Sequence, residues 1–278
     1  MKSNSGFWNK AIRLVLLMIL TYVLLFPMTV ALFTSLKPPG EVITATPSLL
    51  PHDFTLQNYR VLFSLREFPR YLLNSFLVSC YTALISILVS SLAAYALVWM
   101  NFTGKRTIVK AIFFTYMFPQ ILLVLPLFLM CYELNLIDTK MALVLTYLSF
   151  SLPFCVWMLK SFFESIPEEL VEAAMLDGCT YLQCLFKVVL PVSIPAVTAV
   201  LVFSFVLGWS EYLFANTLII SDTNRTIAIG LQTLIGYYRV DYGLLTAASI
   251  VMTLPVLLFF VTVQKYFIQG LVVGSVKE

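Results

Sequence analysis

Six long stretches that carry almost no charge constrain this chain more than any other feature. They are bounded by Ile12 and Leu36, Arg70 and Lys105, Lys110 and Glu133, Lys140 and Lys160, Lys187 and Glu211, and Asp241 and Lys265. Each is near or above the roughly 20 residues that an α-helix needs to cross a bilayer. Because hydrocarbon offers an unpaired backbone no partner, each crossing must be helical. We therefore expect an all-α polytopic membrane protein with six transmembrane helices, at about residues 12–34, 71–99, 108–131, 140–160, 194–219 and 244–267.

The composition is that of a chain solvated mainly by lipid. Of 278 residues, 60% are hydrophobic and 11% are charged, whereas a soluble domain carries about 25% charged residues. The net charge of +3 is small and the basic residues are scattered, which argues against a nucleic-acid partner. A single histidine, His52, and five cysteines without metal-ligand spacing argue against histidine catalysis or a metal site. The cysteines are expected to be free thiols.

The distribution of basic residues predicts the orientation of the chain. Cytoplasmic loops of membrane proteins are enriched in Lys and Arg. The N-terminus and the short loop after the second span contain basic residues and no acids; these residues are Lys2, Lys10, Arg13, Lys105, Arg106 and Lys110. With six spans, both termini then lie in the cytoplasm. The first apolar run is too long for a cleaved signal and lacks an Ala-x-Ala site, so we expect it to be retained.

No soluble domain interrupts the spans, so residues 1–278 are expected to form a single transmembrane domain. The first outer loop, Lys37–Arg70, is rich in proline, with Pro38, Pro39, Pro47 and Pro51, and is expected to be extended and packed on the outer face. No GxxxxGK[ST] motif is present, so the chain cannot cradle ATP phosphates in that way.

The loop of residues 161–193, between the fourth and fifth spans, is expected to carry two short cytoplasmic helices. Ser165 and Glu168 have the spacing of a capping box, with Pro167 in the first turn. Acidic residues crowd that turn, where the helix dipole favours them. Gly178 stands where a left-handed C-cap would end the first helix.

The second short helix is expected to begin with another capping box, Thr180 with Gln183, to run to about Val189 and to stop at Pro191. Its apolar residues recur at three- and four-residue spacing and predict a face packed against the spans; they are Leu182, Leu185, Phe186 and Val189. In the first helix, the small pair Ala173–Ala174 lets another surface approach closely. Together the two helices have the shape of a knob that fits a socket.

The exact residues of this loop resemble the "EAA" loop of ABC import permeases. The family pattern is Glu-Ala-Ala, three residues, Gly, nine residues, Ile, one residue and Leu-Pro. This chain matches every spacing with Glu172-Ala173-Ala174, Gly178 and Leu190-Pro191, and Val188 replaces the Ile. Asp177 and Pro195 are also typical. The tail from Gln264 to Lys277 and the Trp209-Ser210-Glu211-Tyr212 sequence are similar to those of maltose-type carbohydrate permeases, although Ser210 replaces the usual Asn.

This resemblance implies the type I ABC importer permease fold and the shorter, six-span permease subunit of such an importer. In the family, the loop is a coupling helix that docks into a cleft of the ATPase. The implied coupling residues are Glu168, Glu172, Ala173, Ala174, Asp177, Gly178, Leu190 and Pro191. The family's C-terminal tail reaches into the ATPase dimer, which implies contacts from Gly274, Ser275, Val276 and Lys277.

The resemblance also implies the partners. A second permease subunit, a dimer of ATPase subunits and an extracytoplasmic solute-binding protein would assemble with this chain in the bacterial inner membrane, among membrane lipids. ATP and Mg²⁺ would bind the ATPase, so this chain would hold no cofactor or metal and would not be an enzyme. The implied substrate is a carbohydrate.

Several polar or aromatic residues inside the predicted spans are candidates for the substrate pathway. An ionised carboxylate such as Glu211 costs roughly 2.5–3.5 kcal/mol inside a bilayer, so it should face a cavity or a partner. It is either a wall of the pathway or a helix-packing carboxylate. The other candidates for sugar contacts are also ordinary interface residues; they are Tyr116, Gln120, Trp209, Tyr212 and Asn216.

Three other functions fit parts of the sequence. An ion-coupled carrier would need buried charges in several spans, and Glu211 alone is available. A membrane-embedded hydrolase would need a nucleophile with a base, and no such arrangement is evident. An ABC importer for a non-sugar solute shares the EAA loop, and only the tail and the Trp209–Tyr212 sequence favour a sugar.

Overall fold

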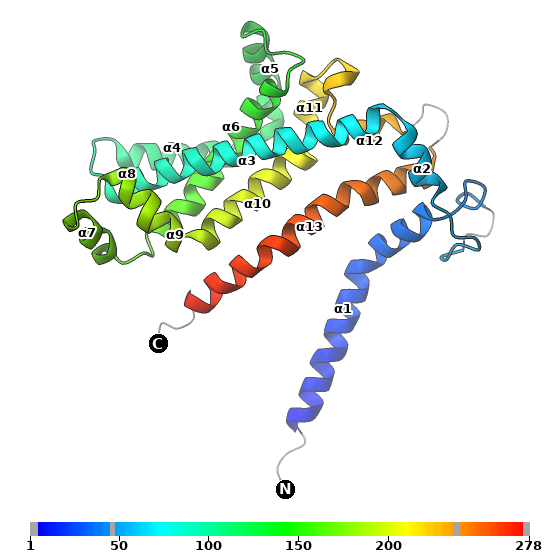
Figure 1. Ribbon diagram of the computed structural model, residues 1–278, viewed down its shortest axis with the longest axis horizontal. Helices are drawn as coiled ribbons and strands as arrows, with labels where there is room; N and C mark the ends of the chain where they lie inside the picture. Colours follow the sequence, from blue (N-terminus) through cyan, green and yellow to red (C-terminus); the bar gives the residue numbers. More distant parts are fainter. Residues whose placement is uncertain (1–4, 45–47, 236–239, 275–278) are drawn as a thin grey trace. The chain divides into compact units, whose positions relative to one another are not determined.

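The computed structural model describes residues 5–44, 48–235 and 240–274, with side chains throughout except at 5–8, 11 and 266–274. These residues are helical or irregular, with a single isolated bridge between Ile235 and Val240, so the expected all-α class is confirmed. The elements, shown in Figure 1, are in chain order α1 (Ser5–Ser35), α2 (Gln57–Ser64), α3 (Glu67–Trp99), α4 (Lys105–Met117), the 3₁₀ turn η1 (Gln120–Leu123), α5 (Val124–Glu133), α6 (Lys140–Phe163), α7 (Glu168–Leu176), α8 (Tyr181–Cys184), the π-helical turn η2 (Leu185–Val189), α9 (Leu190–Val192), α10 (Ile194–Ser210), α11 (Leu213–Leu218), the 3₁₀ turn η3 (Asp222–Asn224), α12 (Ile227–Thr233) and α13 (Tyr242–Gly274).

Among the described residues, four helices are long and apolar enough to cross a membrane, and they match the first, second, fourth and sixth predicted spans. Their apolar stretches are Ile12–Ser35, Glu67–Trp99, Lys140–Phe163 and Tyr242–Lys265. Two bent pairs bring the possible number to six. The elements from α8 to α9 meet α10 at 86°, and α4 meets the segment Gln120–Glu133 at 98°.

The third and fifth predicted spans are each interrupted rather than continuous helices. In the third, α4 ends because Phe118 is extended, with ψ 131°, as a residue before proline prefers. Pro119 has no N–H to continue the helix. In the fifth, α10 ends at Ser210, Glu211 is extended, and α11 then covers only Leu213–Leu218.

Three helices, α3, α6 and α10, pack side by side and form the centre of the larger compact unit, which comprises residues 67–230 and 255–278 (Figure 1). Small polar residues at three- and four-residue spacing line the buried side of α3; they are Ser75, Ser79, Thr82, Ser86 and Ser90. Small residues let helix backbones approach closely in a membrane. A Cβ added to Gly208 of α10 would lie 3.1 Å from the Cα of Ser79.

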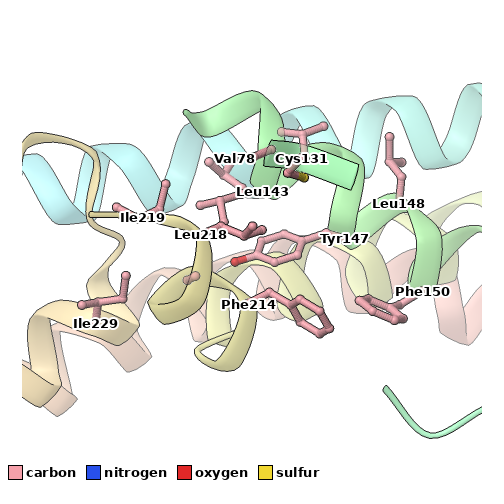
Figure 2. Packing of buried hydrophobic residues seen from close by; sticks show 13 residues of the cluster. Val78, Cys131, Leu143, Tyr147, Leu148, Phe150, Phe214, Leu218, Ile219 and Ile229 are labelled. Atoms are coloured by element: carbon pink, nitrogen blue, oxygen red, sulfur yellow. The ribbon is translucent and has the colours of Figure 1, made fainter. Parts of the chain in front are cut away.

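An apolar cluster at one end of these helices holds α5 and α11 against α6. Figure 2 shows Tyr147 of α6 among Leu143, Phe214 and Leu218. The rings of Phe150 and Phe214 lie 4.9 Å apart. Because α11 has only six residues, its position depends on this tertiary packing rather than on its own helix propensity.

The turn between α5 and α6 is tied to the segment that follows α11. The carboxylate of Asp138 accepts hydrogen bonds from the backbone N–H groups of Ile220 at 3.0 Å and Ser221 at 2.9 Å. Burial alone would raise the pKa of Asp138, but the hydrogen bonds from Ser221, Ile220 and Asn224 together hold it below its ordinary value. Asp138 also has a left-handed backbone, with φ 64°, which Asp tolerates better than most residues.

In the smaller unit, which comprises described residues within 1–66 and 231–254, hydrogen bonds from α2 hold the end of α1. The buried Asn58 donates hydrogen bonds to the carbonyls of Ser35 and Lys37, both at 2.9 Å. The Ser35 and Tyr59 hydroxyls lie 2.7 Å apart. The outer loop thus contains the helix α2, which the expectation of an extended loop did not include. The apolar side chains of α1 are exposed over most of its length, as in a helix surrounded by lipid or another subunit.

We predict that Gly208→Val destabilises the protein by about 1–3 kcal/mol, because the larger side chain overpacks the contact with Ser79. Gly40→Val is the matched control, since nothing lies within 4 Å of a Cβ added at Gly40. Thermal unfolding of the purified protein in detergent measures both. Equal melting temperatures for the two variants would contradict the close contact of α3 with α10.

Candidate functional site

The helix α7 lies in the loop that was singled out in the sequence, and its beginning differs from the expectation. Its N-cap is Pro167, which makes no side-chain cap. The Ser165 hydroxyl instead donates to the carbonyl of Phe162 at 2.6 Å, near the end of α6. The predicted Ser165–Glu168 capping box was therefore wrong, because the hydroxyl is used by the preceding helix. Glu168 and Glu169 do lie in the first turn of α7, where the helix dipole favours carboxylates.

The end of α7 and the start of α8 confirm the predicted turn. Gly178 has φ 86°, the left-handed conformation that glycine adopts without steric cost. The N–H of Cys179 then bonds to the carbonyl of Ala174 at 3.1 Å. Thr180 and Gln183 form the expected reciprocal capping box, with distances of 3.3 Å and 3.0 Å.

The second short helix does not stop at Pro191. It continues through the π turn η2 and α9 to Val192, and the chain bends at Ser193. Because a π turn hydrogen-bonds i to i+5, the predicted α-helical stripe is not kept. Leu185 and Val189 are buried as expected, but Leu182 and Phe186 are exposed.

The inner side of α7 is built into the packing of the spans. Val171 and Ala174 are buried in one cluster with Tyr95 of α3, Phe163 of α6 and Val200 of α10. A force applied to α7 would therefore reach three membrane helices through close-packed side chains.

The outer side of α7 and the adjoining turn are available to a partner. Among the exposed residues here are Glu168, Glu172, Ala173, Leu176, Asp177 and Gly178. Ala174, by contrast, faces the spans. Leu176 is 88% exposed, the most exposed large hydrophobic residue among those described. The sequence did not lead us to Leu176, although its position outside the helix face of Val171 and Ala174 indicates an exposed side chain. In the following helices Leu190 is half-buried and Pro191 is exposed.

A cavity of about 450 Å³ lies beside α7. Glu168, Glu172 and Met175 line it together with Trp99, at the end of α3. The Trp99 ring lies 5.0 Å from Tyr95 and 5.6 Å from Phe163, so it also belongs to the packing that joins α7 to the spans. No motif in the sequence pointed to Trp99, because its neighbourhood arises only in the folded chain.

The candidate C-terminal contact is described only in part. Gly274 is the last residue of α13. Ser275, Val276 and Lys277 lie outside the described residues.

Glu211 stands at the break between α10 and α11. Its carboxylate accepts hydrogen bonds from the backbone N–H groups of Phe214 at 2.8 Å and Ala215 at 3.0 Å. These N–H groups belong to the first turn of α11, and no carbonyl within that helix can accept their hydrogen bonds. The geometry thus gives Glu211 the helix-packing role, and its place in a substrate pathway stays a prediction.

The remaining pathway candidates divide by exposure and by position. Trp209 is 3% exposed and stacks on Phe205 at 5.8 Å, so it packs within the chain. Tyr116 and Gln120 are exposed at the bend between α4 and α5. The other two candidates are also exposed; Tyr212 lies at the break between α10 and α11, and Asn216 lies within α11.

Residues 82–273 match the family of binding-protein-dependent transport system inner membrane components. The chain belongs to this family. The permease is 39% identical over 255 residues to an inner membrane ABC transporter permease protein of Escherichia coli, with 91% of each chain covered. It is 38% identical to the sulfoquinovosyl glycerol transport system permease protein of Agrobacterium fabrum, covering 99% of this chain and 96% of the relative. It is 33% identical to the trehalose transport system permease protein of Mycobacterium tuberculosis, covering 87% and 89%.

The fold is that of a known ABC importer. The permease is similar to a chain of a bacterial ABC transporter that imports the acidic polysaccharide alginate, with a TM-score of 0.83 and 24% identity over 96% of this chain and 99% of that chain. A chain of the alginate transporter in complex with its pentasaccharide-bound periplasmic protein matches with a TM-score of 0.70 and 16% identity, over 94% of each chain. The expected ABC importer permease fold is confirmed.

We predict that Glu211→Gln lowers the stability of the permease by about 1–3 kcal/mol, because the amide retains one acceptor for two N–H groups. Asn216→Ala is the control, since this exposed side chain leaves the Glu211 contacts intact. Both can be compared by thermal unfolding followed by tryptophan fluorescence. A Glu211→Gln melting temperature equal to that of wild type would show that the carboxylate does not hold α11.

Proposed function

We propose that the permease forms half of the translocation pathway of a bacterial ATP-driven carbohydrate importer. A second permease would form the other half, an ATPase dimer would dock on α7, and an extracytoplasmic binding protein would deliver the sugar. The sugar substrate is supported by the sulfoquinovosyl glycerol and trehalose permeases among the relatives. The binding protein is supported by the family, whose transport systems depend on one.

The observation that carries the proposal is the two-sided environment of α7. On one side, Val171 and Ala174 share a core with the spans. On the other, Glu172, Leu176 and Asp177 are exposed at the tip of the loop. A helix that is fixed on its inner side and free on its outer side suits a lever between a cytoplasmic motor and a membrane pathway. Its exposed acidic and apolar residues fit a partner cleft with a basic rim and an apolar floor.

The chain itself needs no catalytic group for this role. ATP and Mg²⁺ would bind the partner ATPase, whose closure moves α7. The motion would pass through the Trp99 and Phe163 packing to α3 and α6. Nucleotide and sugar then drive the switch between inward- and outward-facing states by binding the two states unequally.

The proposed orientation places α7 and both termini in the cytoplasm. Lys105 and Arg106 begin α4, directly after the turn that follows α3, and they lie on the same side of the spans as α7 because α3 and α6 both end there. Lys105 bonds the carbonyls of Val98 and Met100 at 3.1 Å and 3.3 Å and so caps α3. Basic residues in such a short loop favour the cytoplasmic side.

We predict that affinity purification of the full chain from its native membrane recovers an ATPase and a second permease.

Gly178→Val should reduce ATPase recovery and sugar uptake about tenfold, because a β-branched residue at φ 86° is strained by roughly 1–2 kcal/mol and displaces the loop. Gly178→Asn is the matched control, since Asn tolerates the left-handed conformation.

Two results would overturn the proposal. One is recovery of the wild-type chain without an ATPase, even after gentle crosslinking at Cys179 beside the turn. The other is assembly and uptake by Gly178→Val at the level of Gly178→Asn. Immunoblotting of the membranes confirms that each variant is present in equal amount.

A further inference from the structure

We infer that a cavity between α4 and α6 binds an anionic phospholipid, with an acyl chain in its apolar part and the phosphate at Lys110 and Lys160. The cavity has a volume of about 480 Å³, within the range of small-molecule sites. It shares no lining residue with the cavity beside α7, and none of the pathway candidates lines it. This inference goes beyond the proposed transport function.

The body of the cavity is apolar. Ile112 and Phe113 of α4 and Val156 and Trp157 of α6 are among the residues that line it. No side chain of α4 is buried, so its apolar residues need cover from outside the described chain. An acyl chain would provide that cover and fill the irregular space between the helices.

The mouth of the cavity is basic. Because α4 begins and α6 ends at the loop side of the spans, Lys110 and Lys160 lie toward the same membrane surface as α7. Lys160 pairs with Glu164 at 2.5 Å, and Glu164 also lines the cavity. Lys110 is exposed and forms no ion pair within the described part of the chain. Two ammonium groups and one carboxylate leave the mouth with one net positive charge.

Basic pockets between transmembrane helices near the cytoplasmic surface suit anionic lipid headgroups. Trp157 strengthens the assignment, since an indole ring is favourable at headgroup level. The phosphate would pair with Lys110 directly and share Lys160 with Glu164. The apolar body of the cavity thus matches the acyl chain, and its basic mouth matches the phosphate, which lies toward the membrane surface.

The other possible occupant is an apolar helix of the second permease. Such a helix would cover Ile112 and Phe113, but it would remove the net charge of the lysines from water without a counterion, which is costly. The charge of the mouth therefore favours the lipid.

Native mass spectrometry of the complex purified through this chain, with added phosphatidylglycerol or phosphatidylcholine, tests the inference. Phosphatidylglycerol should bind more tightly, and Lys110→Gln should weaken it about fivefold, as expected for one lysine near an anionic headgroup. Glu164→Gln should tighten it by a similar factor, because it frees Lys160. Arg106→Gln, which removes an exposed charge of α4 that does not line the cavity, should change nothing.

Opposite effects of Lys110→Gln and Glu164→Gln would not arise from a general loss of structure. Glycerol 3-phosphate, which has the phosphate without acyl chains, should not displace the lipid. Equal binding of the two lipids, equal effects of Lys110→Gln and Arg106→Gln, or displacement by glycerol 3-phosphate would each overturn the inference. So would a cavity that retains no lipid because the second permease covers it. Recovery of the ATPase in the same sample tests the transport function separately.

Discussion

The need to pair every backbone N–H and C=O group inside hydrocarbon governs this structure. Long helices meet it by themselves, and each break in a helix needs another solution. At the break after α10, the Glu211 carboxylate accepts hydrogen bonds from two N–H groups that have no partner within α11. At the end of α4, Pro119 has no backbone N–H group, so one fewer donor needs a partner there. The intramembrane charge is thus explained first by the backbone around it.

Close packing of α3, α6 and α10 turns these helices into a body that can transmit force. The hydroxyls of Ser86 and Ser151 lie 2.8 Å apart, and Gly208 lets α10 approach Ser79. Tightly packed interiors transmit displacement rather than absorb it. Because Val171 and Ala174 of α7 join the same packing, α7 and the three membrane helices can move together.

The surfaces that this packing leaves uncovered indicate what surrounds the permease. The side chains of α1 are apolar and exposed, and α4 buries no side chain. In a soluble protein such faces would cause aggregation, whereas in a bilayer lipid can cover them. The lysines at the mouth of the α4–α6 cavity distinguish a lipid headgroup from a purely apolar neighbour.

Sequence alone determined the helical class, four of the spans, the left-handed turn at Gly178 and the Thr180 capping box. These depend on the length of apolar runs and on the conformational limits of single residues, which are local properties. Tertiary structure decided where two spans break, which side of α7 is buried and that Trp99 lies beside it. Those features depend on which surfaces meet, and residues far apart in the chain supply them. The short helix after Glu211 is also held by the packing of Phe214 against Phe150, a contact that no local pattern in the sequence encodes.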